Sequence, residues 1–119
     1  MHFDDKTWKI IAAFVDPGQA PSRGRPHASR RAVLSGIVHV LVNDISWHQL
    51  PIQLYRVSGN TCWRQFREWV SNGVWLSIEH ELACILIAQG AKDAAIAFVD
   101  AAARRIDAAC RRKARAPQY

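Results

Sequence analysis

The sequence predicts an all-α fold, a small helical bundle that contains a helix-turn-helix. Half of the 119 residues are hydrophobic, which is enough for one compact domain with a buried core. Apolar residues recur three and four positions apart along most of the chain, and proline and glycine interrupt this helical pattern at intervals. A short helix, a connection and an amphipathic helix follow one another near the middle, which is the order of elements in a helix-turn-helix.

The first helix is expected from Asp4 to about Val15. The Asp4 side chain can cap it by accepting a hydrogen bond from the backbone N–H of Thr7. Residues 16–22 contain two prolines and a glycine and cannot continue the helix, so they are predicted to form a loop. This loop leads into an Arg-Gly-Arg-Pro segment, residues 23–26, which we expect to be an extended, exposed basic arm.

The arm has the composition of a segment that enters the minor groove of DNA. Gly24 lacks a Cβ, so the backbone can lie against the floor of a narrow groove. Arg23 and Arg25 then project into the negative potential of that groove, which is deepest in A·T-rich sequence. Any basic loop with a glycine and a proline can also contain this tetrapeptide. The arm therefore indicates DNA binding only in combination with the helix-turn-helix.

The second helix is predicted over residues 28–42 and is expected to lie at the centre of the bundle. It is apolar around much of its circumference. Gly36 costs about 1 kcal/mol of helix propensity relative to alanine, which indicates that another helix crosses close to the backbone there. Arg30 and Arg31 lie in its first turns, where helix amides also favour phosphate. Taken one at a time, each is equally consistent with a solvated arginine.

The segment from Asp44 to Pro51 is predicted to be a short helix, with Ser46 as its cap and the proline as its end. Residues 52–58 are expected to form a connection. An amphipathic helix then starts near Asn60. Its apolar residues fall within one arc at 100° per residue and are expected in the core: Cys62, Phe66, Trp69 and Val70.

The opposite arc of this helix carries residues suited to reading DNA. The second helix of a helix-turn-helix contacts bases with its N-terminal residues, and arginine pairs with guanine while asparagine or glutamine pairs with adenine. We therefore expect base contacts from Asn60, Thr61, Arg64 and Gln65. Arg67, Arg30 and Arg31 are expected to hold phosphates.

Asn72 and Gly73 are expected to end the amphipathic helix as its C-cap. A further helix from Val74 to about Gln89 closes the bundle, and Gly90 interrupts it. This organisation predicts a DNA-binding domain over residues 1–90 and an alanine-rich basic segment over 91–119. For the latter we favour a helix from residue 93 to about 112, while the apolar run at residues 96–100 leaves a strand as an alternative.

The formal net charge of +6 is clustered in two places. Residues 21–75 sum to +5 and residues 104–119 also to +5, whereas residues 76–103 sum to −3. Two separate basic clusters indicate a polyanionic partner, although a single basic run is usually only a solvated surface. Together with the helix-turn-helix pattern, they predict double-stranded DNA as the partner.

The sequence favours a cytoplasmic, nucleoid-associated protein without a cofactor. No apolar stretch approaches the roughly 20 residues of a membrane span, and no leader opens the chain. Cys62, Cys84 and Cys110 are odd in number and widely spaced, which favours reduced thiols. His80 stands four residues before Cys84, but two further ligands for a structural zinc site are not apparent nearby, so no metal is assigned.

Residues 3–89 resemble the N-terminal domain of bacterial DDE-type insertion-sequence transposases, in the family named for insertion sequence 5. The resemblance implies a helix-turn-helix that binds the terminal inverted repeats of the element. The residues that carry it are Trp8, Gly24-Arg25-Pro26, Arg31, Val33-Leu34, Gly36-Ile37, Trp47, Leu50-Pro51, Arg64, Phe66, Trp69 and Gly73-Val74-Trp75.

The same resemblance places Asp100 at the first metal-binding aspartate of the catalytic domain. The hydroxyl residues that follow it in relatives are replaced by Ala101 and Ala102, and no second aspartate or glutamate of the catalytic set is present. Two-metal phosphoryl chemistry needs several carboxylates, so we expect no enzymatic activity from this chain alone. A chain of this extent resembles the upstream-frame product of family members that are encoded in two frames.

The principal hypothesis is a sequence-specific DNA-binding protein that forms the terminus-recognising part of a transposase. A transcriptional regulator that has taken over this domain is the close alternative. From other classes, the alternatives are a metal-dependent nuclease or strand-transfer subunit completed by another chain, with Asp100 as one ligand, and an interaction protein whose basic face is incidental. Besides DNA, the expected partners are a second copy of the chain or the downstream-frame transposase chain.

Overall fold

The computed structural model describes residues 4–15 and 29–115, with side chains as far as residue 108. Over these ranges all regular structure is helical, as the sequence predicts. The elements, in order, are α1 (Asp5–Val15), α2 (Arg30–Asn43), the 3-10 turn η1 (Trp47–Gln49), α3 (Ile52–Tyr55), α4 (Gly59–Ser71), α5 (Val74–Ala88) and α6 (Lys92–Arg115). The predicted basic arm, residues 23–26, lies outside the described residues.

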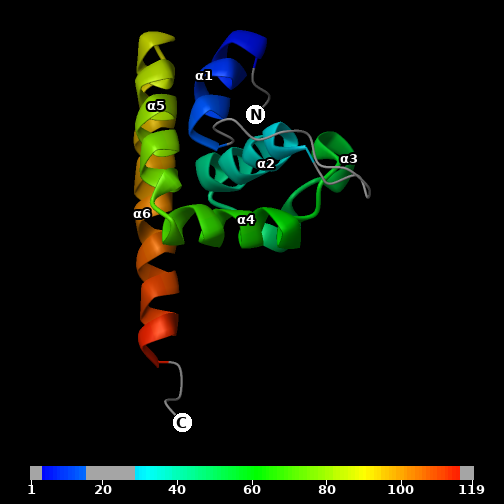
Figure 1. Cartoon of the computed structure of the whole chain (residues 1–119), viewed down its shortest axis with the longest axis vertical. Coiled ribbons are helices and arrows are strands. Elements are labelled where there is room, and N and C mark those ends of the chain that lie inside the picture. Colours follow the sequence, from blue (N-terminus) through cyan, green and yellow to red (C-terminus); the bar gives the residue numbers. More distant parts are fainter. Residues whose placement is uncertain (1–3, 16–28, 116–119) are drawn as a thin grey trace.

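Two layers make up the bundle (Figure 1). α5 and α6 stand side by side along the long axis, and α2 and α4 lie across them. α1 packs on α5 beside this layer. The C-terminal part of α6 continues beyond α4, away from the rest of the bundle.

α2 is the central helix, as expected from its apolar circumference. Eight of the nine residues from Val33 to Leu41 are buried, and the ninth, His39, is half-exposed. Gly36 is the predicted point of close approach. A Cβ at this position would lie 2.8 Å from the Sγ of Cys62 on α4, so the absence of a side chain lets α2 and α4 pack closely.

The structure confirms the predicted caps at Asp4 and Ser46 and adds one at Ser58, which the sequence analysis places in a connection. Asp4 accepts a 2.7 Å hydrogen bond from the backbone N–H of Thr7, and Ser58 accepts a 3.1 Å bond from that of Thr61. In η1 the backbone N–H of Ser46 donates to the side-chain oxygen of Gln49 at 2.9 Å. Each of these bonds satisfies an N–H group that a helix start would otherwise leave unpaired.

The connection predicted over residues 52–58 is partly wrong, because it contains the helical turn α3. Tyr55 at the end of this turn is buried, and its hydroxyl lies 2.8 Å from Nδ1 of His39 on α2. Arg56 then adopts the left-handed conformation, with φ of 59°, and turns the chain toward α4. A contact sixteen residues away in sequence fixes this single turn, so a local periodicity cannot predict it.

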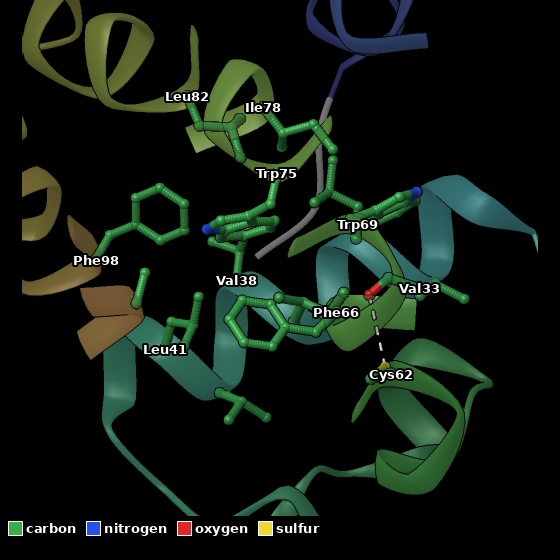
Figure 2. Close-up of a cluster of buried hydrophobic side chains, with 14 of the residues drawn as sticks. Val33, Val38, Leu41, Cys62, Phe66, Trp69, Trp75, Ile78, Leu82 and Phe98 are labelled. Atoms are coloured by element: carbon green, nitrogen blue, oxygen red, sulfur yellow. Dashed lines mark hydrogen bonds between the residues drawn. The ribbon is translucent and has the colours of Figure 1, made fainter. Parts of the chain in front are cut away.

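An aromatic row runs through the core. The rings of Phe66 on α4 and Trp75 on α5 meet edge to face at 4.9 Å, and Trp75 lies 5.9 Å from Phe98 on α6 (Figure 2). Phe98 is fully buried, as are Ala101 and Ala102 three and four residues later. This helical spacing places residues 92–102 in the same core as the preceding helices. The alternative of a strand at residues 96–100 is therefore wrong.

Candidate nucleic-acid interface

The outer face of α4 is polar from its first turn to its last. Cys62, Phe66 and Trp69 are buried, which confirms the predicted apolar arc, and Val70 and Trp63 are half-buried. The exposed residues are Asn60, Thr61, Arg64, Arg67, Glu68 and Ser71, while Gln65 is half-buried at the edge. At 100° per residue, Arg64 lies near the middle of this face, between Asn60 and Glu68.

The start of α4 is held tightly against η1. A Cβ on Gly59 would lie 1.8 Å from the carbonyl oxygen of Trp47, so only glycine fits at this point. The centre of the Trp47 ring also lies 5.6 Å from that of Phe66, which is further along α4. Backbone and ring contacts with one residue of η1 thus fix both the position and the rotation of α4, which determines where its polar face points.

The first turns of α2 and α4 lie next to each other. The Cys62 thiol donates to the carbonyl oxygen of Val33 at 3.5 Å (Figure 2). Burial raises the pKa of this thiol to about 12, so it stays protonated and acts as a core residue. The contact brings the start of α2, with Arg30 and Arg31, close to the start of α4, with Asn60 and Thr61.

The three arginines that are predicted to contact phosphates lie in different surroundings. Arg30 is half-buried in the first turn of α2. Arg31 donates at 2.6 Å to Asp5, whose side chain is 89% exposed, and so it ties α1 to α2. Arg67 is exposed and its guanidinium lies 4.8 Å above the ring of Trp63, a cation–π contact that orients it along α4.

The predicted base contacts all lie in the first two turns of α4. Arg64 and Asn60 are exposed. The Thr61 hydroxyl accepts a hydrogen bond from the Ser58 hydroxyl at 3.0 Å, so the cap orients it. The side-chain amide of Gln65 donates to the Glu68 carboxylate at 3.3 Å. Asn60 and Arg64 lie on one row of the helix and Thr61 and Gln65 on the next, and their donors and acceptors are of the types that read base edges.

Two further residues belong to this surface although we did not single them out from the sequence. Glu68 lies beside Arg64 on the exposed face, and a carboxylate can accept from the amino group of cytosine. Arg56 is exposed in the turn directly before α4. An arginine in the turn of a helix-turn-helix can be recognised from sequence only if the turn itself can be located. Here that requires knowing that α3 ends at Tyr55.

α6 holds the loop that positions α4. Arg105 donates to the carbonyl oxygen of Ile45 and lies 3.6 Å from the Asp44 carboxylate, while its guanidinium sits 5.3 Å above the ring of Trp47. Arg104 also reaches Asp44, at 3.2 Å. Since Trp47 contacts Gly59 and Phe66, Arg105 supports the start of α4 through one intermediate residue.

Asp100, the residue that matches the first catalytic aspartate of the resembled family, lies on the exposed side of α6. Its carboxylate forms an ion pair with Arg104 at 3.3 Å. In the described part of the chain, no three or more histidine, cysteine or acidic side chains gather in a way that could hold a metal ion. Within the same ranges, no helix combines the length and the apolar character needed to cross a membrane.

Comparison with known proteins assigns the chain to a family. Residues 3–78 match the family model described as "Putative transposase of IS4/5 family (DUF4096)", a range that includes α2, α3 and α4. The chain is also similar to the "Insertion element IS402 uncharacterized 16.2 kDa protein" of Burkholderia cepacia, with 37% identity over 106 residues. That alignment covers 86% of this chain and 71% of the relative. No solved structure matches the chain.

Proposed function

The chain belongs to the IS4/5 family of transposases, and on that premise we propose that it binds double-stranded DNA in a sequence-specific way through α4. The observation that carries the proposal is the outer face of α4. It presents Asn60, Arg64 and Glu68 in a row on a helix whose start is fixed by Gly59 and Trp47. A helix with these side chains in its first turns fits the major groove, where each base pair offers a distinct pattern of donors and acceptors.

The roles of the individual residues follow from their positions. Arg64 reads a guanine, while Asn60 and Gln65 read adenines at neighbouring steps. Thr61 contacts a base or an adjacent phosphate through its hydroxyl. Arg67, Arg56 and Arg30 hold phosphates on the two sides of the groove. Arg31 serves first as the link between α1 and α2, because a phosphate would have to displace the Asp5 carboxylate from it.

We propose that the DNA unit extends beyond residue 90, contrary to the boundary expected from the sequence. Phe98 is part of the core, and Arg105 contacts the loop that positions α4. The bundle as far as about residue 107 would then be needed for DNA binding. The arm at residues 23–26 would add minor-groove contacts beside the site of α4.

The target that suits a transposase is the terminal inverted repeat of the element. We propose that this chain recognises such repeats and does not cut DNA by itself, since the Asp100 carboxylate is paired with Arg104 and no carboxylate cluster accompanies it among the described residues. The catalytic carboxylates would then lie outside the described residues.

The test is a binding measurement with the purified chain. We expect it to bind duplexes that carry the inverted repeats at the ends of its own element at least a hundredfold more tightly than scrambled duplexes of the same composition. Log affinity should fall linearly with log salt, because phosphate contacts release counterions. Equal affinity for both duplexes would contradict sequence-specific recognition. Protection of promoters in place of inverted repeats would identify a regulator, and magnesium-dependent cleavage would contradict the non-catalytic role.

A further inference from the structure

The outer face of α5 differs from an ordinary exposed helix surface. Its exposed residues are Leu76, Ser77, His80, Cys84, Ile87 and Ala88, and none of them is charged. Leu76 is 66% exposed and Ile87 55% exposed. The opposite side, with Trp75, Ile78 and Leu82, is packed in the core. A helix that is apolar on both sides is expected to be covered on both.

The centre of this face holds two groups that bind metal ions. His80 and Cys84 lie one turn apart, both exposed, with Nε2 of the imidazole and Sγ of the thiol 3.8 Å from each other. Zinc binds thiolate at about 2.3 Å and imidazole at about 2.0 Å, so two such ligands at a tetrahedral angle are about 3.6 Å apart. The pair is therefore already close to the arrangement in which both groups bind one ion.

His80 and Cys84 make up half of a tetrahedral ligand set, and the described residues provide no third side chain beside them. A second copy of the chain would provide the other half. A twofold axis that passes between His80 and Cys84 brings the same two side chains of the second copy to the same point, as in any interface of this symmetry. We propose that two copies of this chain associate through α5 and share one zinc-class divalent ion, bound by His80 and Cys84 of each copy.

The neighbours of the pair favour a second copy as the occupant. Leu76 lies one turn before His80, and Ile87 lies nearly one turn after Cys84, on the same side of the helix. When two copies of α5 cross in opposite directions, Leu76 of each copy approaches Ile87 of the other. The apolar side chains then flank the ion and exclude water from it.

The size of the face explains why the ion is required. A fifteen-residue helix is about 22 Å long and about 10 Å wide, so one face covers far less than the roughly 800 Å² per partner of a typical stable interface. Apolar contact alone would give weak association. The metal–ligand bonds supply the remainder, and each Cys84 thiol releases its proton to solvent as its sulfur binds the ion.

The experiment needs no DNA, so its outcome is independent of the proposed DNA binding. The molar mass of the full chain is measured by light scattering during a zinc titration, followed by addition of a chelator. We expect the mass to double at one zinc ion per two chains and to return to that of one chain with the chelator. Cobalt(II) in place of zinc should produce the near-ultraviolet absorption of a thiolate–cobalt bond.

Variants assign the site. Cys84→Ser and His80→Gln should abolish both the dimer and the cobalt absorption at equimolar metal, with circular dichroism confirming that the helices are intact. His48→Gln, at an exposed histidine on η1, is the matched control and should change neither. Cys62 and Cys110 remain in every variant, so an absorption that survives Cys84→Ser would assign the thiolate elsewhere and overturn the proposal.

Leu76→Lys tests the second copy separately from the ion. It should weaken the zinc-dependent dimer at least tenfold, because two lysines would be placed in the apolar flanks, whereas the chelating pair is untouched. Three results would each overturn the proposal: a chain that stays monomeric at saturating zinc, one zinc bound per monomer, or a dimer that the chelator leaves intact.

Discussion

α4 and α5 are consecutive helices of similar length, joined through Asn72 and Gly73, yet their outer faces are opposite in character. Both bury an aromatic side chain in the same core row, Phe66 from α4 and Trp75 from α5. Outside, α4 presents arginine, glutamate and amide side chains, whereas the exposed residues of α5 include no Asp, Glu, Lys or Arg, and its two glutamates, Glu79 and Glu81, are half-buried. The inward faces determine the fold. We propose that the outward faces differ because they bind different partners, a polyanion on α4 and a protein surface on α5.

The largest expected effect is a loss of stability when the start of α4 is no longer anchored against Trp47. Gly59→Ala should destabilise the protein by about 3 kcal/mol or more, because the new Cβ would overlap the Trp47 carbonyl oxygen and force backbone to move. Gly73→Ala is the matched substitution at the other end of α4. Nothing lies within 4 Å of a Cβ there, so only the positive φ of 83° is penalised, by about 1 to 2 kcal/mol. Denaturant unfolding of both variants measures the difference, and equal losses would contradict the anchoring role of Trp47.

The next effect concerns α6 and the loop that it supports. Arg105→Ala should cost about 2 kcal/mol, because the half-buried guanidinium loses its hydrogen bond to Ile45 and its contact with the Trp47 ring. Arg104→Ala should cost much less than Arg105→Ala, since its ion pairs are exposed and screened by solvent. Backbone amide exchange at the start of α4 should accelerate in the first variant only. If the two variants behave alike, α6 does not position α4.

Substitutions on the two outer faces should affect DNA binding differently. Arg67→Ala should weaken binding to all duplexes by a similar factor and reduce the slope of log affinity against log salt by about 1, as expected for a lost phosphate contact. Ser77→Ala on the outer face of α5 should leave both quantities unchanged. Fluorescence anisotropy over a salt series provides both. A loss of affinity from the α5 variant equal to that from Arg67→Ala would mean that DNA contacts both faces.

The smallest effect is a pH dependence that arises between α2 and α3. Burial lowers the pKa of His39, whose Nδ1 meets the Tyr55 hydroxyl. The unfolded state therefore takes up the proton more readily than the folded one. The contribution of neutral His39 to stability is present above its unfolded pKa of about 6.5 and is lost as pH falls through the lower, folded pKa. Thermal unfolding between pH 7.5 and 5 should show this decline, and His39→Gln should flatten it. An unchanged pH profile in that variant would assign the proton to another group.

The sequence predicts most of what depends on local spacing. The buried arc of α4, the caps at Asp4 and Ser46, and the close approach at Gly36 all follow from residue type and periodicity. What the sequence does not reveal depends on contacts between distant residues. α3 is a single turn fixed by Tyr55 against His39, and the pairing of Arg31 with Asp5 joins residues 26 positions apart. Arg105 reaches Ile45 across 60 positions, which is why its contact with the loop before α4 cannot be predicted from periodicity.

The residues of the candidate site also differ in how far local spacing predicts them. Helical spacing suffices to place Asn60, Arg64 and Arg67 on an exposed face, and the structure confirms this exposure. Glu68 lies beside Arg64 on that face, but an acidic residue is not recognised when the search is for basic residues. The role of each side chain at a base or phosphate stays a prediction, as do the contacts of the arm at residues 23–26.

The most direct measurement of the central claim, that α4 reads base sequence, is selection of bound duplexes from a random pool with the wild-type chain and Arg64→Ala in parallel. We expect the wild type to select a defined motif. Arg64→Ala should select the same motif with the preference at one base pair removed, which corresponds to about 1 to 3 kcal/mol of discrimination at that pair. An identical motif from both chains, with affinity lowered equally for all sequences, would contradict the assignment of α4 as the reading helix.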